Sequence, residues 1–216
     1  MTRYGQPAAD LNTCGPQSRF VTDFILSGGP GPGWNASNPV CPSPEDYNSA
    51  IMTEHARRTR YAELLRQLEA LVEGEPDLIA NLANITAVLK EALPAASWVG
   101  FYIKRGDDLV LGPFQGLVAC TRIAKGRGVC GAAAEKRQSQ VVGDVTTFAD
   151  HIACDANSRS EIVVPIVRET GVLAVLDIDS HELHAFDELD RDGLEMVGRL
   201  VATLTWPRGE RQPASG

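Results

Sequence analysis

Three cysteines stand within one stretch of this chain, among glycine-rich turns and basic side chains. Cys120, Cys130 and Cys154 all lie between residues 112 and 166. A thiolate is a strong nucleophile, and nearby cations or a helix N-terminus lower the pKa of a thiol. Basic residues lie close in sequence to these cysteines: Arg122, Lys125, Arg127, His151 and Arg159. The stretch is therefore a candidate site for thiol redox chemistry. The alternative is that the cysteines are small buried hydrophobic residues, most of all Cys120, which falls within a predicted strand.

The number and spacing of the cysteines argue against a metal centre or a framework of structural disulfides. Cys120 and Cys130 are ten residues apart, Cys130 and Cys154 are twenty-four apart, and no CxxC pair occurs. The total of five cysteines is odd, and Cys14 and Cys41 receive no role. No basic segment followed by an apolar one opens the chain, so we expect no secretory signal and a cytoplasmic location. A transient catalytic disulfide is acceptable there. We expect neither a metal nor a cofactor.

Composition predicts a globular protein with one main domain. The chain has 216 residues, of which 44% are hydrophobic and 22% are charged, enough to bury a core without disulfide bonds. Its formal net charge is −8, whereas a general surface for nucleic acid or anionic lipid needs a basic patch. No apolar run approaches the length of a membrane span. We therefore expect no nucleic-acid partner and no membrane partner.

The two ends of the chain differ from its middle. Pro/Gly clusters at 28–33 and 39–44 do not sustain regular structure, so residues 1–51 are predicted to be an irregular extension. A compact domain is predicted for residues 52–206, and a polar tail for residues 207–216.

Hydrophobic periodicity predicts helices at both ends of the compact domain and strands between them. Apolar residues recur every three or four positions in three segments, 53–73, 76–92 and 187–204. Period-two patterns predict strands at 97–103, 108–114, 116–123, 139–142, 161–167 and 172–179, with a short helix at 129–137 and a loop at 143–158. This order indicates an α+β fold with helices on one face of an antiparallel sheet.

Alternation along the strand at 97–103 sorts its side chains onto the two faces of the sheet. Val99, Phe101 and Ile103 form an aliphatic face that should meet the helices. Trp98 and Tyr102 share the other face. Because aromatic rings with polar tips often line pockets, this second face is a candidate ligand site.

The same alternation places three acidic residues on the face of the two aromatic rings: Glu161, Asp177 and Asp179. Converging acids bind an ammonium group and raise one another's pKa, so that one can remain protonated as a general acid. The alternative is that they lie in water at strand ends or pair with arginines. The Gly126–Gly131 segment leads into a predicted helix, whose free N–H groups suit a carboxylate, although it also fits an ordinary turn. These features together describe a pocket for a free amino acid.

Several motifs in this region occur together in one known family. GPFQG-xx-AC, GVCG, VxDV, HIACD-xx-S-x-SEIVVP and LDIDS resemble the GAF-domain free methionine-(R)-sulfoxide reductases, over about residues 55–205. The resemblance implies a GAF domain, a central antiparallel sheet with helices on one face and a ligand cavity on the other. It also implies an oxidoreductase that reduces free L-methionine-(R)-sulfoxide to L-methionine, with thioredoxin as the reductant.

The resemblance also implies a role for each candidate residue. Cys154 matches the nucleophile, which becomes a sulfenic acid. Cys120 matches the partner that resolves it to an intramolecular disulfide, and thioredoxin then reduces that bond. Cys130 matches a third cysteine that assists recycling or is itself the nucleophile in some members, so which thiol attacks first stays open. The substrate-binding acids correspond to Glu161, Asp177 and Asp179, and the aromatic wall corresponds to Trp98 and Tyr102.

Two other functions and one structural question stay open at this point. A non-catalytic GAF domain that senses a small molecule is the first alternative to an enzyme. A thiol redox switch that signals through a partner is the second. A homodimer is also left open.

Overall fold

The structure is a computed structural model that describes residues 44–148 and 155–207, with side chains from residue 53 onward. The chain forms two compact units, residues 1–56 and 57–216. Helix α2 (Pro44–Val72) begins nine residues before the predicted start at Thr53, so residues 44–51 are helical and not irregular. The rest of the predicted extension, with Cys14 and Cys41, lies outside the described residues. No described helix combines the length and hydropathy that crossing a bilayer requires.

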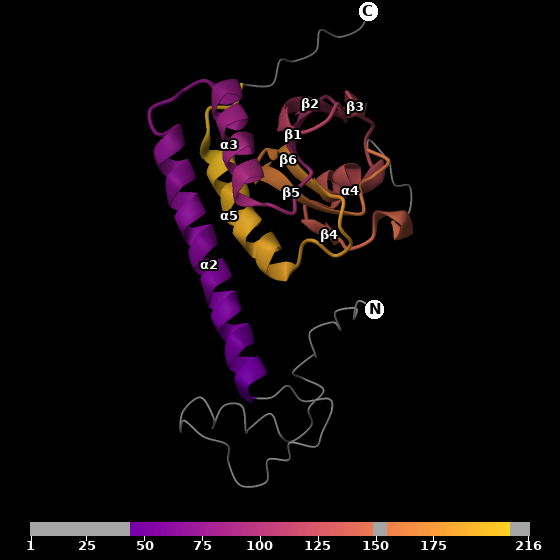
Figure 1. Cartoon of the computed structure of the whole chain (residues 1–216). Coiled ribbons are helices and arrows are strands. Elements are labelled where there is room, and N and C mark those ends of the chain that lie inside the picture. Colours follow the sequence, from indigo (N-terminus) through magenta and orange to yellow (C-terminus); the bar gives the residue numbers. More distant parts are fainter. Residues whose placement is uncertain (1–43, 149–154, 208–216) are drawn as a thin grey trace, which may run out of the picture. The chain divides into compact units, whose positions relative to one another are not determined.

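A six-stranded antiparallel sheet forms the centre of the second unit, in the order β3-β2-β1-β6-β5-β4 (Figure 1). It is built from β1 (Trp98–Arg105), β2 (Asp108–Gln115), β3 (Arg122–Ile123), β4 (Gln140–Val142), β5 (Ser160–Arg168) and β6 (Gly171–Ser180). The predicted α+β class and the antiparallel pairing are confirmed. The third strand is much shorter than predicted, because only Arg122 and Ile123 pair with β2. Cys120 therefore lies in the loop before β3 and not inside a strand.

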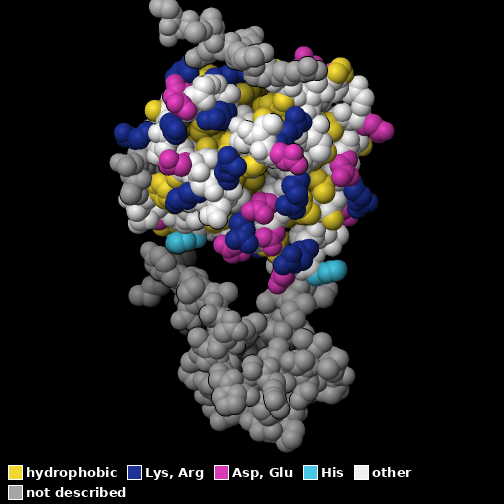
Figure 2. Space-filling model, turned by 180° about the vertical axis from the view of Figure 1, so that it is seen from behind, with side chains coloured by type: hydrophobic (Ala, Val, Ile, Leu, Met, Phe, Trp, Pro, Cys, Tyr) yellow, Lys and Arg dark blue, Asp and Glu magenta, His cyan; other side chains and the backbone are white. Residues whose placement is uncertain are grey.

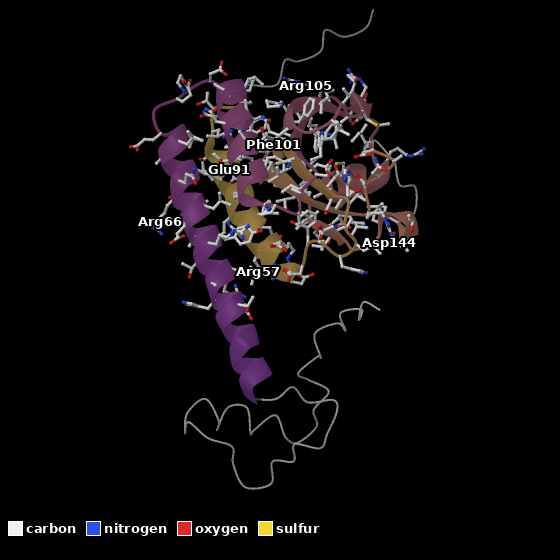
Figure 3. The ribbon with its side chains drawn as sticks, viewed as in Figure 1. Arg57, Arg66, Glu91, Phe101, Arg105 and Asp144 are labelled. Atoms are coloured by element: carbon white, nitrogen blue, oxygen red, sulfur yellow. The ribbon has the colours of Figure 1, made fainter. Side chains whose placement is uncertain are left out.

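One face of the sheet is covered by helices (Figure 1). Residues 57–72 of α2, together with α3 (Leu78–Ala92) and α5 (Glu188–Thr203), pack on the aliphatic side chains of β1, β5 and β6. Figure 3 shows Phe101 between the sheet and these helices, and its side chain is fully buried. The opposite face carries α4 (Gly128–Lys136) and the short 3₁₀ helix η3 (Val145–Thr147). The predicted separation of the two faces is confirmed.

A hydrogen-bonded cluster joins α2 to the start of α5. Tyr61 donates to Asp190 Oδ1 over 2.8 Å, and Arg57 donates to Asp190 Oδ2 over 2.9 Å and to Asp187. Asp187 is the N-cap of α5 and forms a capping box with Asp190. Because the Asp190 carboxylate is buried, these donors supply the hydrogen bonds that it has lost from water.

Acidic and basic side chains are interspersed over the face of the molecule drawn in Figure 2. On this face the described side chains form no extended strip of a single charge.

Candidate active site

A pocket lies on the sheet face opposite the three packed helices, beneath the first turn of α4. Its sheet side is formed by Trp98, Tyr102, Glu161, Asp177 and Asp179. The other side is formed by the first turn of α4 and the loop before β3, through Arg127, Gly128, Val129, Cys130, Leu117, Val118 and Ala119. The structure thus brings together the predicted aromatic residues, the three predicted acids and one of the three predicted cysteines.

The three acids meet because β1, β6 and β5 are neighbours in the sheet. Trp98 pairs with Asp179 in the register, and Asp179 pairs in turn with Glu161 on β5. Asp177 lies opposite Gly100, two residues along β6, so its side chain is on the same face. Glu161 and Asp177 are only 6% and 7% exposed, whereas Asp179 is half-buried.

Burial is the main cause of a raised pKa at each acid, because it disfavours the charged form. Burial and then the charge of Asp179 raise the pKa of Glu161 to about 8. Burial raises the pKa of Asp179 to about 6. The pKa of Asp177 is held well above its usual range by burial, then by the charges of Asp179 and Glu161. At neutral pH the site therefore combines an ionised Asp179 with neutral carboxyl groups that can donate a proton.

An aromatic stack forms the wall of the pocket. Trp98 stacks on Tyr102 with ring centroids 5.9 Å apart, and on Phe114 with centroids 5.4 Å apart. The polar tips hold the loop that carries Cys120: Trp98 Nε1 donates to the Leu117 carbonyl, and the Tyr102 hydroxyl donates to the Cys120 carbonyl, both over 3.1 Å. Sequence reasoning missed Phe114, because an irregularity in the β1–β2 register between Gly100 and Tyr102 places Phe114 opposite Gly100.

Gly100 makes room for this wall, and adding a methyl group there tests it. A Cβ at Gly100 would overlap the Trp98 ring and lie 2.6 Å from Phe114 Cβ. Gly100→Ala is therefore expected to displace the Trp98 ring, lower the free energy of unfolding by about 1–3 kcal/mol and weaken ligand binding at the pocket. Thermal unfolding and a binding titration check both effects. Gly74→Ala is a matched control, because no heavy atom lies within 4 Å of its added Cβ and only its positive φ is strained. Equal ligand affinity in wild type and Gly100→Ala would contradict the role of Trp98.

The cysteines occupy different environments. Cys130 is a buried free thiol in the first turn of α4. Burial raises the pKa of this thiol well above its usual value, and the charge of Asp177 acts in the same direction. Cys120 is disulfide-bonded in the loop before β3. Cys154 and His151 lie outside the described residues.

Two of the predicted cationic neighbours of the cysteines, Arg122 and Lys125, lie close to carboxylates of the β1–β2 hairpin. Arg122 pairs with Asp108 at 3.2 Å, and Lys125 lies 3.7 Å from Asp107, so both bind the turn and strand of the β1–β2 hairpin and not a thiol. Arg127 does line the pocket, immediately before α4. The prediction that this glycine-rich segment leads into a helix is confirmed, since α4 starts at Gly128.

Two further polar residues of the pocket were not assigned to the site from the sequence. Ser158 is buried beside Asp179, and its hydroxyl lowers the pKa of that carboxyl group. Asp155 pairs with His181 at 2.9 Å and accepts from the Asn157 backbone N–H, which fixes the rim of the pocket. Ser158 is the serine of the HIACD-xx-S motif, but its burial in the pocket depends on tertiary packing.

Comparison with known proteins agrees with this architecture. The GAF domain family model matches residues 75–204. The chain is 50% identical over 145 residues to a free methionine-R-sulfoxide reductase of Escherichia coli. This alignment covers 67% of this chain and 88% of that protein. These observations define the class of protein as a GAF domain.

Two solved structures of enzymes with this name are also similar. One is the free methionine-R-sulfoxide reductase of Neisseria meningitidis in complex with its substrate, with 50% identity, a TM-score of 0.65 and coverage of 67% of this chain and 87% of that one. The other is fRMsr of Staphylococcus aureus in its reduced form, with 45% identity, a TM-score of 0.65 and coverage of 68% and 95%. The chain belongs to the GAF-domain family, among the free methionine-R-sulfoxide reductases.

Proposed function

We propose that this protein reduces free L-methionine-(R)-sulfoxide to L-methionine. The observation that carries the proposal is the cluster of three acids, two of them buried, beside an aromatic wall. The chain that holds this cluster is 50% identical over 145 residues to a reductase of that name. A buried carboxylate oxygen without a hydrogen-bond partner among the described residues, such as Asp177 Oδ1, is costly unless a ligand or a reaction uses it. The relatives support the substrate class.

Each part of a free amino acid finds a matching group in the pocket. Asp179, whose pKa of about 6 leaves it ionised at neutral pH, binds the substrate ammonium. The backbone N–H groups that begin α4 bind its carboxylate, since they point outward from a helix N-terminus. Trp98 and Tyr102 contact the side chain near the sulfoxide. A methionine within a peptide lacks both terminal charges, so this pocket selects the free amino acid.

The chemistry follows from the protonation states. A neutral carboxyl group, Glu161 or Asp177, donates a proton to the sulfoxide oxygen and makes the sulfur electrophilic. The Cys154 thiolate attacks that sulfur, the oxygen passes to the cysteine as a sulfenic acid, and methionine leaves. Cys130 is a poor candidate for this attack, because the raised pKa of its thiol keeps it protonated.

Regeneration needs a second thiol and an external dithiol. The Cys120 thiol attacks the sulfenic sulfur, an S–S bond forms and water leaves. Thioredoxin then exchanges its dithiol for this disulfide and returns both cysteines to the reduced state. The disulfide-bonded state of Cys120 supports this assignment. Such a cycle fits a reducing compartment like the cytoplasm.

The decisive experiment supplies purified protein with thioredoxin, thioredoxin reductase and NADPH, and compares four substrates. Free methionine-(R)-sulfoxide should drive NADPH oxidation and appear as methionine. The free (S)-epimer and both epimers in an N-acetylated, C-amidated form should not. Equal turnover of the capped substrate would rule out the proposed recognition of the two terminal charges. No turnover of the free (R)-epimer would rule out the function.

A further inference from the structure

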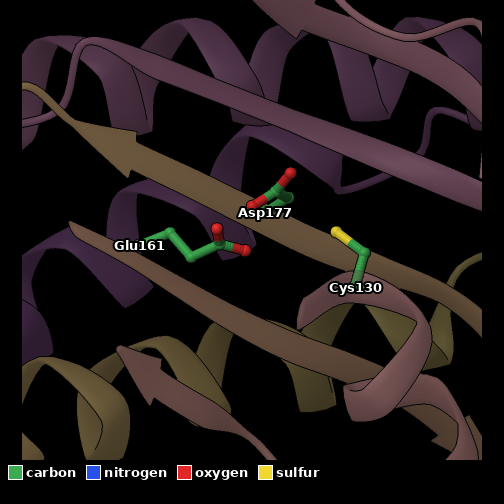
Figure 4. A group of neighbouring side chains, drawn as sticks. All are labelled: Cys130, Glu161 and Asp177. Atoms are coloured by element: carbon green, nitrogen blue, oxygen red, sulfur yellow. The ribbon is translucent and has the colours of Figure 1, made fainter. Parts of the chain in front are cut away.

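Three groups with metal-binding atoms converge in the pocket from three different elements. Cys130 comes from α4, Glu161 from β5 and Asp177 from β6, and one ligand atom of each lies within 4.8 Å of the others. Figure 4 shows the Cys130 sulfur and both carboxylates turned toward one another. All three side chains are buried.

A second observation indicates that this cluster takes a ligand. Asp177 Oδ1 is buried and has no hydrogen-bond partner among the described residues. Buried carboxylate oxygens are nearly always paired, so an oxygen of this kind in a pocket points to a bound group. The ammonium of an amino acid uses carboxylate oxygens alone, whereas a metal ion also uses the sulfur of Cys130, whose thiol already makes a side-chain hydrogen bond with Asp177.

We propose that Cys130, Glu161 and Asp177 also form a binding site for a thiophilic divalent cation, with Zn²⁺ as its probe. A thiolate with carboxylate oxygens is a donor set that zinc accepts, whereas magnesium and calcium prefer oxygen alone. In a tetrahedral zinc site neighbouring ligand atoms are about 3.3–3.8 Å apart. Atoms that already lie within 4.8 Å of one another reach this spacing by small side-chain rotations.

Occupancy by the cation and occupancy by the substrate exclude each other. The cation takes the carboxylate oxygens that an ammonium or a sulfoxide would contact, and a carboxylate bound to a metal has no proton to donate. Zn²⁺ is therefore a competitive inhibitor of the proposed reductase. This consequence depends on the proposed function, whereas the binding site itself does not.

The binding test removes the other thiols as ligands. The full-length chain carries Cys14→Ser and Cys41→Ser and is used in its disulfide form, with one free thiol verified by thiol titration. Zn²⁺ is titrated at pH 7.5 against a chromophoric chelator. We expect one equivalent of Zn²⁺ to bind. Cys130→Ser and Asp177→Asn should each weaken the affinity at least about tenfold, because changes to groups that merely support a metal ligand commonly have effects of that size. Glu182→Gln, an exposed acid just after β6, should bind Zn²⁺ as the parent does.

Circular dichroism and thermal unfolding show whether each variant is folded. If Asp177→Asn does not fold, the affinity of Cys130→Ser for Zn²⁺ alone decides the proposal. Failure to bind one equivalent, or unchanged affinity in Cys130→Ser, overturns the proposal even if the reductase is active. In a turnover assay in which a non-chelating phosphine replaces the thioredoxin system as reductant, Zn²⁺ should raise KM and leave kcat unchanged. A fall in kcat at constant KM would contradict a shared site.

Discussion

Replacing Cys154 by serine should lower kcat/KM for free methionine-(R)-sulfoxide by at least about 10³-fold, because a hydroxyl of ordinary acidity cannot replace an attacking thiolate. The effect should be the same with thioredoxin or with a small phosphine as reductant, since the block precedes any disulfide. The measurement is methionine formed per enzyme in both multiple-turnover and single-turnover experiments. Wild-type burst amplitude in Cys154→Ser would show that another thiol attacks first.

Cys120→Ser should behave differently if this thiol only resolves the sulfenic acid. One equivalent of methionine should form rapidly, while turnover with thioredoxin should fall at least about 100-fold because no disulfide is made. Trapping with a dimedone reagent, followed by mass spectrometry, should place the sulfenic acid on Cys154.

Cys130→Ser is the matched control among the three cysteines. Its buried thiol has a raised pKa, so it should retain the single-turnover burst. Loss of that burst in Cys130→Ser alone would assign the nucleophile to Cys130 and reverse the roles proposed for the cysteines.

Periodicity predicted the face of each long strand, because neighbouring side chains on a strand must point to opposite sides of the sheet. The separation of Phe101 from Tyr102, and of Leu176 from Asp177, therefore followed from the sequence alone. The convergence of the acids also followed, once β1, β5 and β6 were assumed to be neighbours. The N-cap of α5 at Asp187 is a local signal of the same kind.

Features that depend on tertiary contacts could not be predicted in this way. The apolar pattern of residues 116–121 suggested a strand, yet these residues form a loop tied to Trp98 and Tyr102 by side-chain hydrogen bonds. The approach of Cys130 to Glu161 and Asp177 could not be predicted either, since it depends on how α4 packs against the sheet. Helix α2 begins at Pro44, and a proline is tolerated in the first turn of a helix.

Replacing Glu161 by glutamine should stabilise the protein at alkaline pH while reducing its activity. The raised pKa means that folded Glu161 holds a proton which the unfolded chain, with an ordinary pKa near 4, releases. The folded state therefore binds more protons than the unfolded state between about pH 4 and pH 8. By linkage, the contribution of Glu161 to stability is fully present below this window and declines as pH rises through it.

Glutamine resembles the neutral acid in shape and has no proton to lose in this window. We expect Glu161→Gln and wild type to have similar melting temperatures near pH 5, in the absence of ligand. The variant should be more stable by about 4–5 kcal/mol at pH 9, a difference of about 10–20 °C. Turnover should fall about 100-fold, because glutamine removes one proton donor for the sulfoxide. Glu169→Gln, at an exposed acid in the β5–β6 turn, is the control that should change neither quantity.

The pH dependence separates electrostatics from packing. A packing defect in Glu161→Gln would shift the melting temperature by the same amount at every pH, whereas the cost of a buried charge appears only where Glu161 ionises. A melting-temperature difference that does not grow between pH 5 and pH 9 would show that Glu161 is not held neutral in the folded protein. A growing difference together with lost activity would show that the pocket retains an acid which costs stability because turnover requires its proton.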